Sequence, residues 1–431
     1  MRKVVRVVSS SDAATRGMRL VELARDERFA EIEDLFAASL RTVVSAETLR
    51  TAWTTELTKT GPITGIGEPT SEPPTAGVTR VGVPVVCEKG EFTVVVSVDG
   101  SGMVHGLRLA PAGATSWEPP SYAAPHRFSE REVTVGTGPL AVPGTMTVPH
   151  GPGPHPGVVL LSGGGPFDRD ETSGPNKPLR DLAWGLASRG VAVLRFDKVT
   201  HVHSHVMTTA GFTMSDEYVP HAVAAVRLLQ NQSTVDLDRV FLLGHSMGGK
   251  VAPRVAQAEK SVAGLVILAG DTQPMHHAAV RVTRYLAALY PDTVTEAAVT
   301  AIAQQAALVD SPLLSPSTPA KDLPFGLTAP YWLDLRDYDP VAAAETLNIP
   351  MLILQGGRDY QVTVEDDLVR WQAGLAHRED VTIRVYEADN HLFFPGSGPS
   401  TPTEYEEAQH VDPAVVADIA EWLNPSQERI G

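Results

Sequence analysis

The first hundred residues of the chain combine helical and strand-like hydrophobic patterns. Apolar residues recur every three or four positions in three segments, which we predict to be helices: 14–25, 27–44 and 46–57. A Gly/Pro/Thr-rich loop is predicted over 61–76. Strand-like runs follow at 78–88, 91–98 and 103–109, the last two joined by a predicted hairpin turn at Gly100. Helices followed by an antiparallel meander predict a small α+β domain over residues 1–110.

The hydrophobic pattern changes after a proline-rich stretch. Residues 111–126 have no hydrophobic period, so we predict a linker and a domain boundary there. Beyond it, short apolar strands alternate with helices. The strands are predicted at 131–136, 141–148, 158–162, 191–196, 240–243, 263–269, 351–355 and 381–386, and the helices at 179–189, 221–230, 248–259 and 413–423. The alternation predicts an α/β fold, with a mostly parallel central sheet and helices on both faces.

One long segment interrupts this alternation. Residues 271–348 contain no clear strand pattern, whereas 280–290 and 293–309 have helical patterns. We predict a helical lid inserted into the sheet order of a catalytic domain that covers 127–431. Tyr331 and Trp332 lie in an aromatic stretch of this segment, where they would either line an acyl pocket or form the core of the lid.

The amino-acid composition bears on the possible partners of the protein and on its location. Asp and Glu outnumber Lys and Arg by 51 to 35, which gives a formal net charge of -16. Such a surface repels phosphates, so we expect no nucleic acid and no membrane as partners. The single cysteine, Cys87, allows no internal disulfide, and we predict a buried, inert thiol. The N-terminal apolar run is too short for a signal peptide, and no segment has the roughly 20 apolar residues that span a bilayer. We therefore expect a cytoplasmic protein.

The most specific motif is Gly244-His245-Ser246-Met247-Gly248. It follows a predicted apolar strand and opens a predicted helix, which is the strand–turn–helix setting of a nucleophile elbow. The two glycines leave room for a sharp, strained turn that exposes the Ser246 hydroxyl. The Met247 N–H, at the positive end of the helix, would then point at the reacting centre. A glycine-rich helix start without chemistry is the alternative.

A nucleophilic serine needs a base that is held by a third group. Asp359 follows the apolar strand 351–355, and His391 follows the strand 381–386, so both lie at the sheet edge where catalytic groups gather. The order Ser, Asp, His is the one expected for this arrangement. Two alternatives remain for the acid: Arg358 could pair with Asp359 structurally, and three other carboxylates are rivals, Glu365, Asp366 and Asp367.

An oxyanion hole needs a second N–H beside that of Met247. The run Gly163-Gly164-Gly165 directly follows the apolar strand 158–162. We expect the Gly164 N–H to be the second donor, with Gly163 or Gly165 as alternatives. Gly163, Gly165 and His245 are further residues that we expect to contact the substrate. A phosphate loop is disfavoured, because no Lys followed by Ser or Thr stands in Walker spacing.

A second histidine cluster, His201-Val202-His203-Ser204-His205, could in principle chelate a metal. No Cys or Glu motif accompanies it, and we expect a loop at the mouth of the cleft instead. We predict no metal and no cofactor.

Residues from about 128 to 425 resemble bacterial α/β-hydrolases of the esterase and dienelactone-hydrolase-like group. The resemblance is carried by the motif at Ser246, by Leu354-Gln355-Gly356-Gly357-Arg358-Asp359, by Asn390-His391-Leu392-Phe393 and by the run from Ser162 to Asp170. That run resembles esterases with an extra N-terminal domain, although relatives often have His-Gly-Ser-Gly-Pro where this chain has Ser162 and Gly164. The resemblance implies the α/β-hydrolase fold, with residues 1–110 as the extra domain.

The residues together predict a serine hydrolase that cleaves a small-molecule carboxylic ester through an acyl–Ser246 intermediate. Three alternatives stay open: an acyltransferase, thioesterase or lactone-processing enzyme on the same triad, a peptidase, and a non-catalytic binding protein on a hydrolase scaffold. For the N-terminal domain we consider two roles, capping of the cleft and formation of a homodimer.

Overall fold

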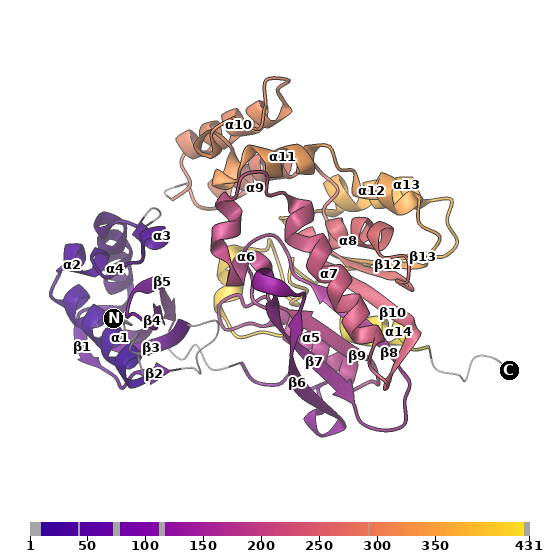
Figure 1. The fold of residues 1–431 in the computed structure, drawn as a ribbon. Coiled ribbons are helices and arrows are strands. Elements are labelled where there is room, and N and C mark those ends of the chain that lie inside the picture. The colour runs from indigo at the N-terminus through magenta and orange to yellow at the C-terminus, as the bar shows by residue number, and fades with distance from the viewer. Residues whose placement is uncertain (1–9, 42–43, 72–77, 112–116, 292, 426–431) are drawn as a thin grey trace, which may run out of the picture. The chain divides into compact units, whose positions relative to one another are not determined.

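The computed structural model describes residues 10–41, 44–71, 78–111, 117–291 and 293–425 (Figure 1). Contacts divide the chain into two compact units: residues 1–116 with 406–408, and residues 117–405 with 409–431. Each unit has its own sheet and its own hydrophobic core.

The smaller unit packs helices on one face of an antiparallel sheet. Its strands run in the order β1-β3-β4-β5, with β2 paired to β3. Along β3 every second side chain is buried, and the buried face packs against α1. Gly17 lets the helix approach closely, because a Cβ there would lie 2.9 Å from Val81 Cγ1. The elements are α1 (Ser10–Arg25), α2 (Phe29–Glu33), α3 (Ala38–Arg41), α4 (Ala46–Thr60), β1 (Ile63–Ile66), β2 (Thr70–Ser71), β3 (Val78–Cys87), β4 (Gly90–Asp99) and β5 (Val104–Pro111).

The prediction of one helix over 27–44 was wrong. The chain there forms two short helices, because the residues between them pair with β5: the Val104 N–H donates to the Leu35 carbonyl, and the Ala37 N–H donates to the Val104 carbonyl. This pairing buries Phe36 completely. The predicted loop 61–76 likewise contains the short strands β1 and β2, although residues 72–77 lie outside the described part of the chain. Cys87 is buried, as predicted.

The larger unit is built on an eight-stranded sheet in the order β13-β12-β11-β10-β8-β9-β7-β6. The strands from β13 to β9 pair in parallel, and β7 and β6 add an antiparallel edge. The predicted α/β fold with a mostly parallel sheet is thus confirmed. The strands are β6 (Phe128–Val135), β7 (Val142–Pro149), β8 (His155–Leu161), β9 (Ala192–Phe196), β10 (Val235–His245), β11 (Leu265–Leu268), β12 (Met351–Gly356) and β13 (Val381–Tyr386).

Helices cover both faces of this sheet (Figure 1). On one face lie α5 (Pro178–Ala187) and α14 (Pro413–Leu423), and on the other lie α7 (Met214–Gln230), α8 (Met247–Ala258) and α13 (Val369–Leu375). Helix α7 begins seven residues before its predicted start, because Thr213 and Asp216 form a capping box there. Pro220 lies inside the helix rather than at its beginning.

Four α-helices of the described chain stand between the neighbouring strands β11 and β12. They are α9 (Met275–Leu289), α10 (Glu296–Asp310), α11 (Ala329–Arg336) and α12 (Pro340–Glu345). The described residues of 271–348 contain no strand, so the segment is a helical insertion into the parallel sheet.

The second half of the predicted linker is packed rather than extended. The Trp117 indole N–H donates to Asp181 Oδ1 at 2.7 Å, and its ring meets the edge of Trp184 at a centroid distance of 4.9 Å. Both partners lie on α5, so residues 117–126 are part of the larger unit. Residues 112–116 lie outside the described part of the chain.

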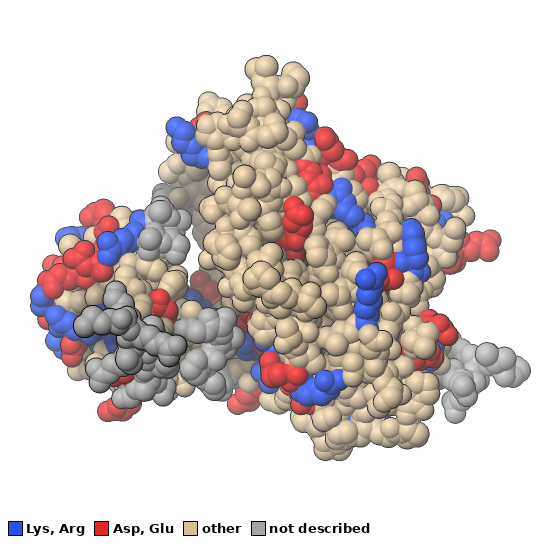
Figure 2. All heavy atoms as spheres, in the orientation of Figure 1, with Lys and Arg blue, Asp and Glu red and all other residues tan. Residues whose placement is uncertain are grey.

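On the face shown in Figure 2, basic side chains are scattered singly or stand beside acidic ones. None of the helices in the described chain is both long enough and apolar enough to cross a bilayer.

Candidate active site

Ser246 lies at a strained turn between β10 and α8. Its backbone has φ 52° and ψ −120°, which a residue with a side chain adopts only when the surrounding structure imposes it. The flanking residues His245 and Met247 are buried, whereas Ser246 is partly exposed. The turn therefore lifts the hydroxyl out of the core at the carboxyl end of a central strand.

The glycines of the motif make this turn possible. A Cβ on Gly244 would lie 2.2 Å from the Gly248 carbonyl oxygen, and a Cβ on Gly248 would lie 2.4 Å from that of Leu161. Real Cβ atoms do not approach backbone oxygens so closely. A side chain at Gly244 would clash with the first turn of α8, and one at Gly248 would push the elbow away from the end of β8.

Asp359 and His391 are joined by a short buried hydrogen bond. His391 Nδ1 lies 2.6 Å from Asp359 Oδ2, and the two side chains are 8% and 0% exposed. The other carboxylate oxygen, Oδ1, accepts from the backbone N–H groups of Gln361 and Val362. With both oxygens engaged, the carboxylate can fix one tautomer of the imidazole and leave Nε2 to accept a proton.

The structure contradicts the alternative pairing of Arg358 with Asp359. The Arg358 guanidinium instead pairs with Glu404 and donates to the carbonyls of Ala388, Ser397 and Gly398. Of the rival carboxylates, Asp367 is buried but accepts from the N–H groups of Thr272, Gln273 and Thr363. This places Asp367 in a network that ties the start of the insertion to the loop after β12.

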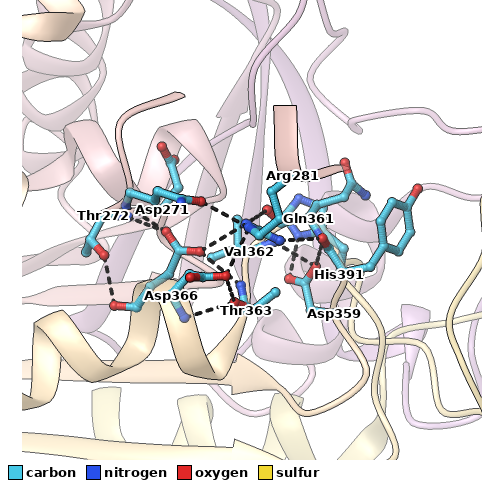
Figure 3. A network of polar contacts seen from close by, with 12 residues as sticks. Asp271, Thr272, Arg281, Asp359, Gln361, Val362, Thr363, Asp366 and His391 are labelled. Carbon is cyan, nitrogen blue, oxygen red and sulfur yellow. Dashed lines mark hydrogen bonds and ion pairs between the residues drawn. The ribbon is translucent and has the colours of Figure 1, made fainter. Parts of the chain in front are cut away.

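Figure 3 shows that network beside the His391–Asp359 pair. Arg281, on helix α9 of the insertion, donates to the carbonyls of Tyr360 and Gln361 and forms a 3.0 Å ion pair with Asp366. The loop that carries Asp359 is therefore held between its own strand and the helical insertion.

Ser246 Oγ has no hydrogen-bond partner among the described residues, so its bond to His391 stays a prediction. The neighbour of Ser246 does contact the residue predicted as the base, since the ring of His245 lies 4.7 Å from the ring of His391. The contact between hydroxyl and imidazole in serine hydrolases often tightens only with substrate in place.

The glycine run after β8 lies against the elbow. A Cβ on Gly163 would be 3.2 Å from Ser246 Cβ, and a Cβ on Gly164 would be 3.7 Å from Met247 Cβ. The Gly163 N–H is already bound to Glu171 Oε1 at 2.8 Å, which removes it as an oxyanion donor. Gly165 has φ +121° and packs on the Phe167 ring. Among the described residues no acceptor binds the Gly164 N–H, so it is free to act as the donor that we expected.

Both ring nitrogens of His245, which we expected to contact the substrate, are engaged by protein atoms. Its imidazole is buried, with Nδ1 2.9 Å from Glu171 Oε1 and Nε2 2.8 Å from the His391 carbonyl oxygen. Burial alone would lower the pKa of His245, but the adjacent Glu171 carboxylate outweighs it and raises the pKa above its ordinary value. His245 therefore links the elbow to the other two loops of the site.

Tyr331 and Trp332 belong to the core. Trp332 is completely buried, and its indole N–H donates to the Pro324 carbonyl. The Tyr331 hydroxyl donates to Glu217 on α7, and burial raises the pKa of that hydroxyl well above its usual range. Of the two predicted roles, the structure supports core packing, in a cluster shared with α7 and α8.

Sequence reasoning missed four buried polar residues around Gly163: Glu171, Lys198, Glu217 and Tyr218. They come from three separate segments of the chain, and only Glu217 and Tyr218 are neighbours in the sequence. Only Glu171 could have been suspected from the sequence, because it directly follows the Asp168-Arg169-Asp170 run that carried the family resemblance.

The described residues contain one group that could hold a metal ion: His276, His277 and Asp310 in the insertion. Each imidazole already lies 2.7 Å from one oxygen of Asp310, which explains the cluster as a clamp between α9 and α10. In the earlier histidine run, His201 and His203 contact separate backbone carbonyls. A cavity of about 620 Å³ beside this clamp is lined by Gln273 and by side chains of α9 and α10, and none of the predicted triad residues lines it.

Comparison with known protein families shows the family to which the chain belongs. The family model described as serine aminopeptidase, S33, matches residues 177–395, which include Ser246, Asp359 and His391. The chain belongs to this family of α/β-hydrolases. Within it, the chain is 38% identical to the Esterase EstD of Thermotoga maritima over 336 residues, which are 78% of this chain and 77% of that protein. The 2,6-dihydropseudooxynicotine hydrolase of Paenarthrobacter nicotinovorans is 27% identical over 142 residues, 33% of this chain and 35% of that protein.

Solved structures of α/β-hydrolases are more distant. A 2,6-dihydroxy-pseudo-oxynicotine hydrolase matches 68% of this S33-family chain and 66% of its own, at 19% identity and a TM-score of 0.44. Est1E of Butyrivibrio proteoclasticus matches 68% of this chain and 97% of its own, at 15% identity and a TM-score of 0.43.

Proposed function

We propose that the protein is a carboxylesterase that works through an acyl–Ser246 intermediate. The observation that carries the proposal is the buried 2.6 Å hydrogen bond between His391 and Asp359, at the same sheet edge as the strained Ser246. The relative with 38% identity is named an esterase, which favours an ester as the scissile bond.

The first step is attack of Ser246 Oγ on the acyl carbon. His391 Nε2 takes the hydroxyl proton, and Asp359 holds the imidazolium through Nδ1–H. The carbonyl electron pair moves onto oxygen, and the N–H groups of Met247 and Gly164 stabilise that oxyanion. Collapse of this intermediate expels the alcohol, which takes the proton from His391.

Water then repeats the sequence on the acyl–enzyme. His391 removes a proton from the water as its oxygen attacks the acyl carbon, and collapse of the second tetrahedral intermediate breaks the bond to Ser246 Oγ, which takes the proton from His391. The products are a carboxylic acid and an alcohol, and the enzyme is regenerated without a cofactor.

Labelling with a fluorophosphonate probe tests the proposal directly. We expect the wild type to be labelled and to hydrolyse p-nitrophenyl acyl esters, and Ser246→Ala to lose both properties. Ser261→Ala, which changes an exposed serine after α8, is the matched control. A folded wild type that resists the probe would reject the proposal.

The family description leaves amide bonds as a second candidate, since it refers to a serine aminopeptidase. Amino-acyl p-nitroanilides discriminate between the two, because their leaving group, p-nitroaniline, is also coloured but is released from an amide bond. Turnover of the anilides exceeding that of the esters would replace the esterase proposal by a peptidase on the same three residues.

A further inference from the structure

The peptide group between Gly163 and Gly164 is held by buried side chains. On the amide side of Gly163, the N–H donates to Glu171 Oε1. On the carbonyl side, the oxygen accepts from Lys198 Nζ at 2.9 Å and from the Tyr218 hydroxyl at 2.7 Å. Lys198 and Tyr218 come from different elements, the loop after β9 and helix α7, so tertiary structure rather than local sequence fixes this glycine.

Fixing the Gly163 carbonyl also fixes the Gly164 N–H. A trans peptide is planar, and its C=O and N–H point in opposite directions. Because the carbonyl is directed toward Lys198 and Tyr218, the Gly164 N–H is directed away from them. Without these contacts, a glycine-rich loop could turn the same peptide over at little steric cost. A flipped peptide would present an oxygen, not a donor, to an oxyanion.

The buried charges around the Gly163 carbonyl are balanced within the core. Lys198 and Glu217 are each 3% exposed and lie 3.0 Å apart. Lys198 Nζ also donates to the Tyr218 hydroxyl at 2.7 Å, so each of its three hydrogens has an acceptor. Glu217 accepts in addition from Thr200 and from Tyr331 of the insertion. A buried ion pair adds little to stability compared with apolar packing, so stability alone does not explain a lysine here.

We propose that Lys198 and Tyr218 are positioning residues that hold the Gly163–Gly164 peptide with its N–H toward the oxyanion. This inference rests on the proposed esterase mechanism. Neither side chain touches the substrate. Their contribution is to set the donor in place before charge develops on the acyl oxygen, so that no reorganisation is needed during the reaction.

Two substitutions test the proposal, with a third as the matched control. Tyr218→Phe removes one donor to the Gly163 carbonyl and keeps the ring, and Lys198→Met removes the other. Tyr386→Phe also deletes a hydroxyl that donates a hydrogen bond, but its partner is Asp418 on α14. We expect kcat to fall by about tenfold to a hundredfold in the first two variants, a part of the loss caused by removing an oxyanion donor outright. KM should stay within about twofold of the wild type, and the control should match the wild type.

A transition-state analogue separates positioning from general damage. An aryl trifluoromethyl ketone adds to the serine and forms an oxyanion, so its inhibition constant should rise by the same factor as kcat/KM falls. A non-reactive ether analogue of the substrate should bind as before. Folded Tyr218→Phe with a wild-type kcat and wild-type inhibition by the ketone would overturn the proposal, even if Lys198→Met failed to fold.

The esterase mechanism and the positioning role can be rejected separately. An unlabelled wild type would overturn the esterase mechanism itself and with it this inference. A wild type labelled at Ser246, together with an unimpaired Tyr218→Phe, would overturn the positioning role alone.

Discussion

His245 donates its Nε2–H to the backbone carbonyl of His391 at 2.8 Å, while its Nδ1 faces Glu171 at 2.9 Å. Both ring nitrogens face oxygen acceptors, an arrangement that suits an imidazolium ion. Glu171 in turn binds the Gly163 N–H. One side chain next to Ser246 thus connects the loop of the proposed base with the loop of the proposed oxyanion hole.

His245→Phe should impair both stability and turnover. The phenyl ring keeps the volume but leaves the Glu171 carboxylate buried without its cation, a change that costs about 3–5 kcal/mol. We expect a lower urea midpoint and a reduced kcat. The double variant with Glu171→Gln should recover part of the stability, because it also removes the stranded charge. Equal stability of the single variant and the wild type would show that the pair is not ionised.

The pH dependence gives a further test of the His245–Glu171 pair. The folded-state pKa of His245 is raised above its unfolded value of about 6.5. Its contribution to stability is therefore fully present below pH 6.5 and is lost as the pH rises through the folded pKa. The stability difference between wild type and His245→Phe should shrink in alkaline buffer, and a difference that grows instead would contradict this assignment.

Asp359→Asn should abolish most of the activity with little change in fold. The carboxylate accepts from His391 on one oxygen and from two backbone N–H groups on the other. An amide has only one oxygen, so one of these sides would face an NH2 group instead. We expect kcat for p-nitrophenyl esters to fall by about 10³–10⁴-fold, as when a triad imidazole loses its correct tautomer.

The rival carboxylate Glu365 provides a matched control for this experiment. Glu365→Gln changes an exposed side chain in the same short segment, six residues further along the chain. It should retain wild-type turnover within about twofold, since the triad mechanism gives Glu365 no role. Loss of activity in Glu365→Gln, with Asp359→Asn active, would move the acid to another residue.

The sequence predicted the parts of the site that are local in the chain. Ser246, Asp359 and His391 each follow an apolar strand, and the strand pattern alone places all three at one edge of the sheet. Lys198 and Tyr218 could not be found in this way. They meet Gly163 only because β9 and α7 pack beside β8, and a lone lysine or tyrosine in a sequence does not indicate a partner 35 or 55 residues away.

The predicted boundaries of helices were wrong where a tertiary contact overrides the local hydrophobic pattern. The segment around Phe36 has helical periodicity, yet its backbone pairs with Val104. Helix α7 continues through Pro220, a residue that in sequence favours a helix start. The role predicted for His245 also changes in the structure. Its place in the motif suggested contact with the substrate, whereas its burial and its two hydrogen-bond partners indicate a structural role.

Asp170→Asn should destabilise the larger unit. Asp170 accepts from Arg195 Nε at 2.8 Å and pairs with Lys177. Burial would raise its pKa, but the charges of Arg195 and Lys177 prevail and lower the pKa to about 2. Substitution leaves the buried Arg195 with Glu130 as its remaining carboxylate, so we expect a loss of about 3 kcal/mol at pH 7 by urea denaturation.

The lowered pKa of Asp170 also determines how the stability of the protein changes with pH. The stabilisation by Asp170 is present above its unfolded pKa of about 3.9 and disappears as the pH falls toward 2. The difference between wild type and Asp170→Asn should therefore narrow at pH 3. Asp238→Asn, at an exposed position before β10 enters the core, should match the wild type at both pH values. A difference that does not depend on pH would mean that the lost hydrogen bonds, not the charge, determine stability.

Asp389→Asn should make the protein more stable at neutral and alkaline pH. The Asp389 side chain is completely buried, and neither carboxylate oxygen has a hydrogen-bond partner among the described residues. Burial and the nearby Asp412 carboxylate raise the pKa of Asp389 to about 7. In the unfolded chain the same group ionises near pH 3.9, so the wild type loses stability between pH 4 and pH 7. The amide carries no charge, and its advantage should therefore grow over that range and reach about 1–3 kcal/mol at pH 8. Thermal unfolding at pH 4.5 and pH 8 measures this, and an Asn variant no more stable than the wild type at pH 8 would show that Asp389 finds a compensating partner when ionised.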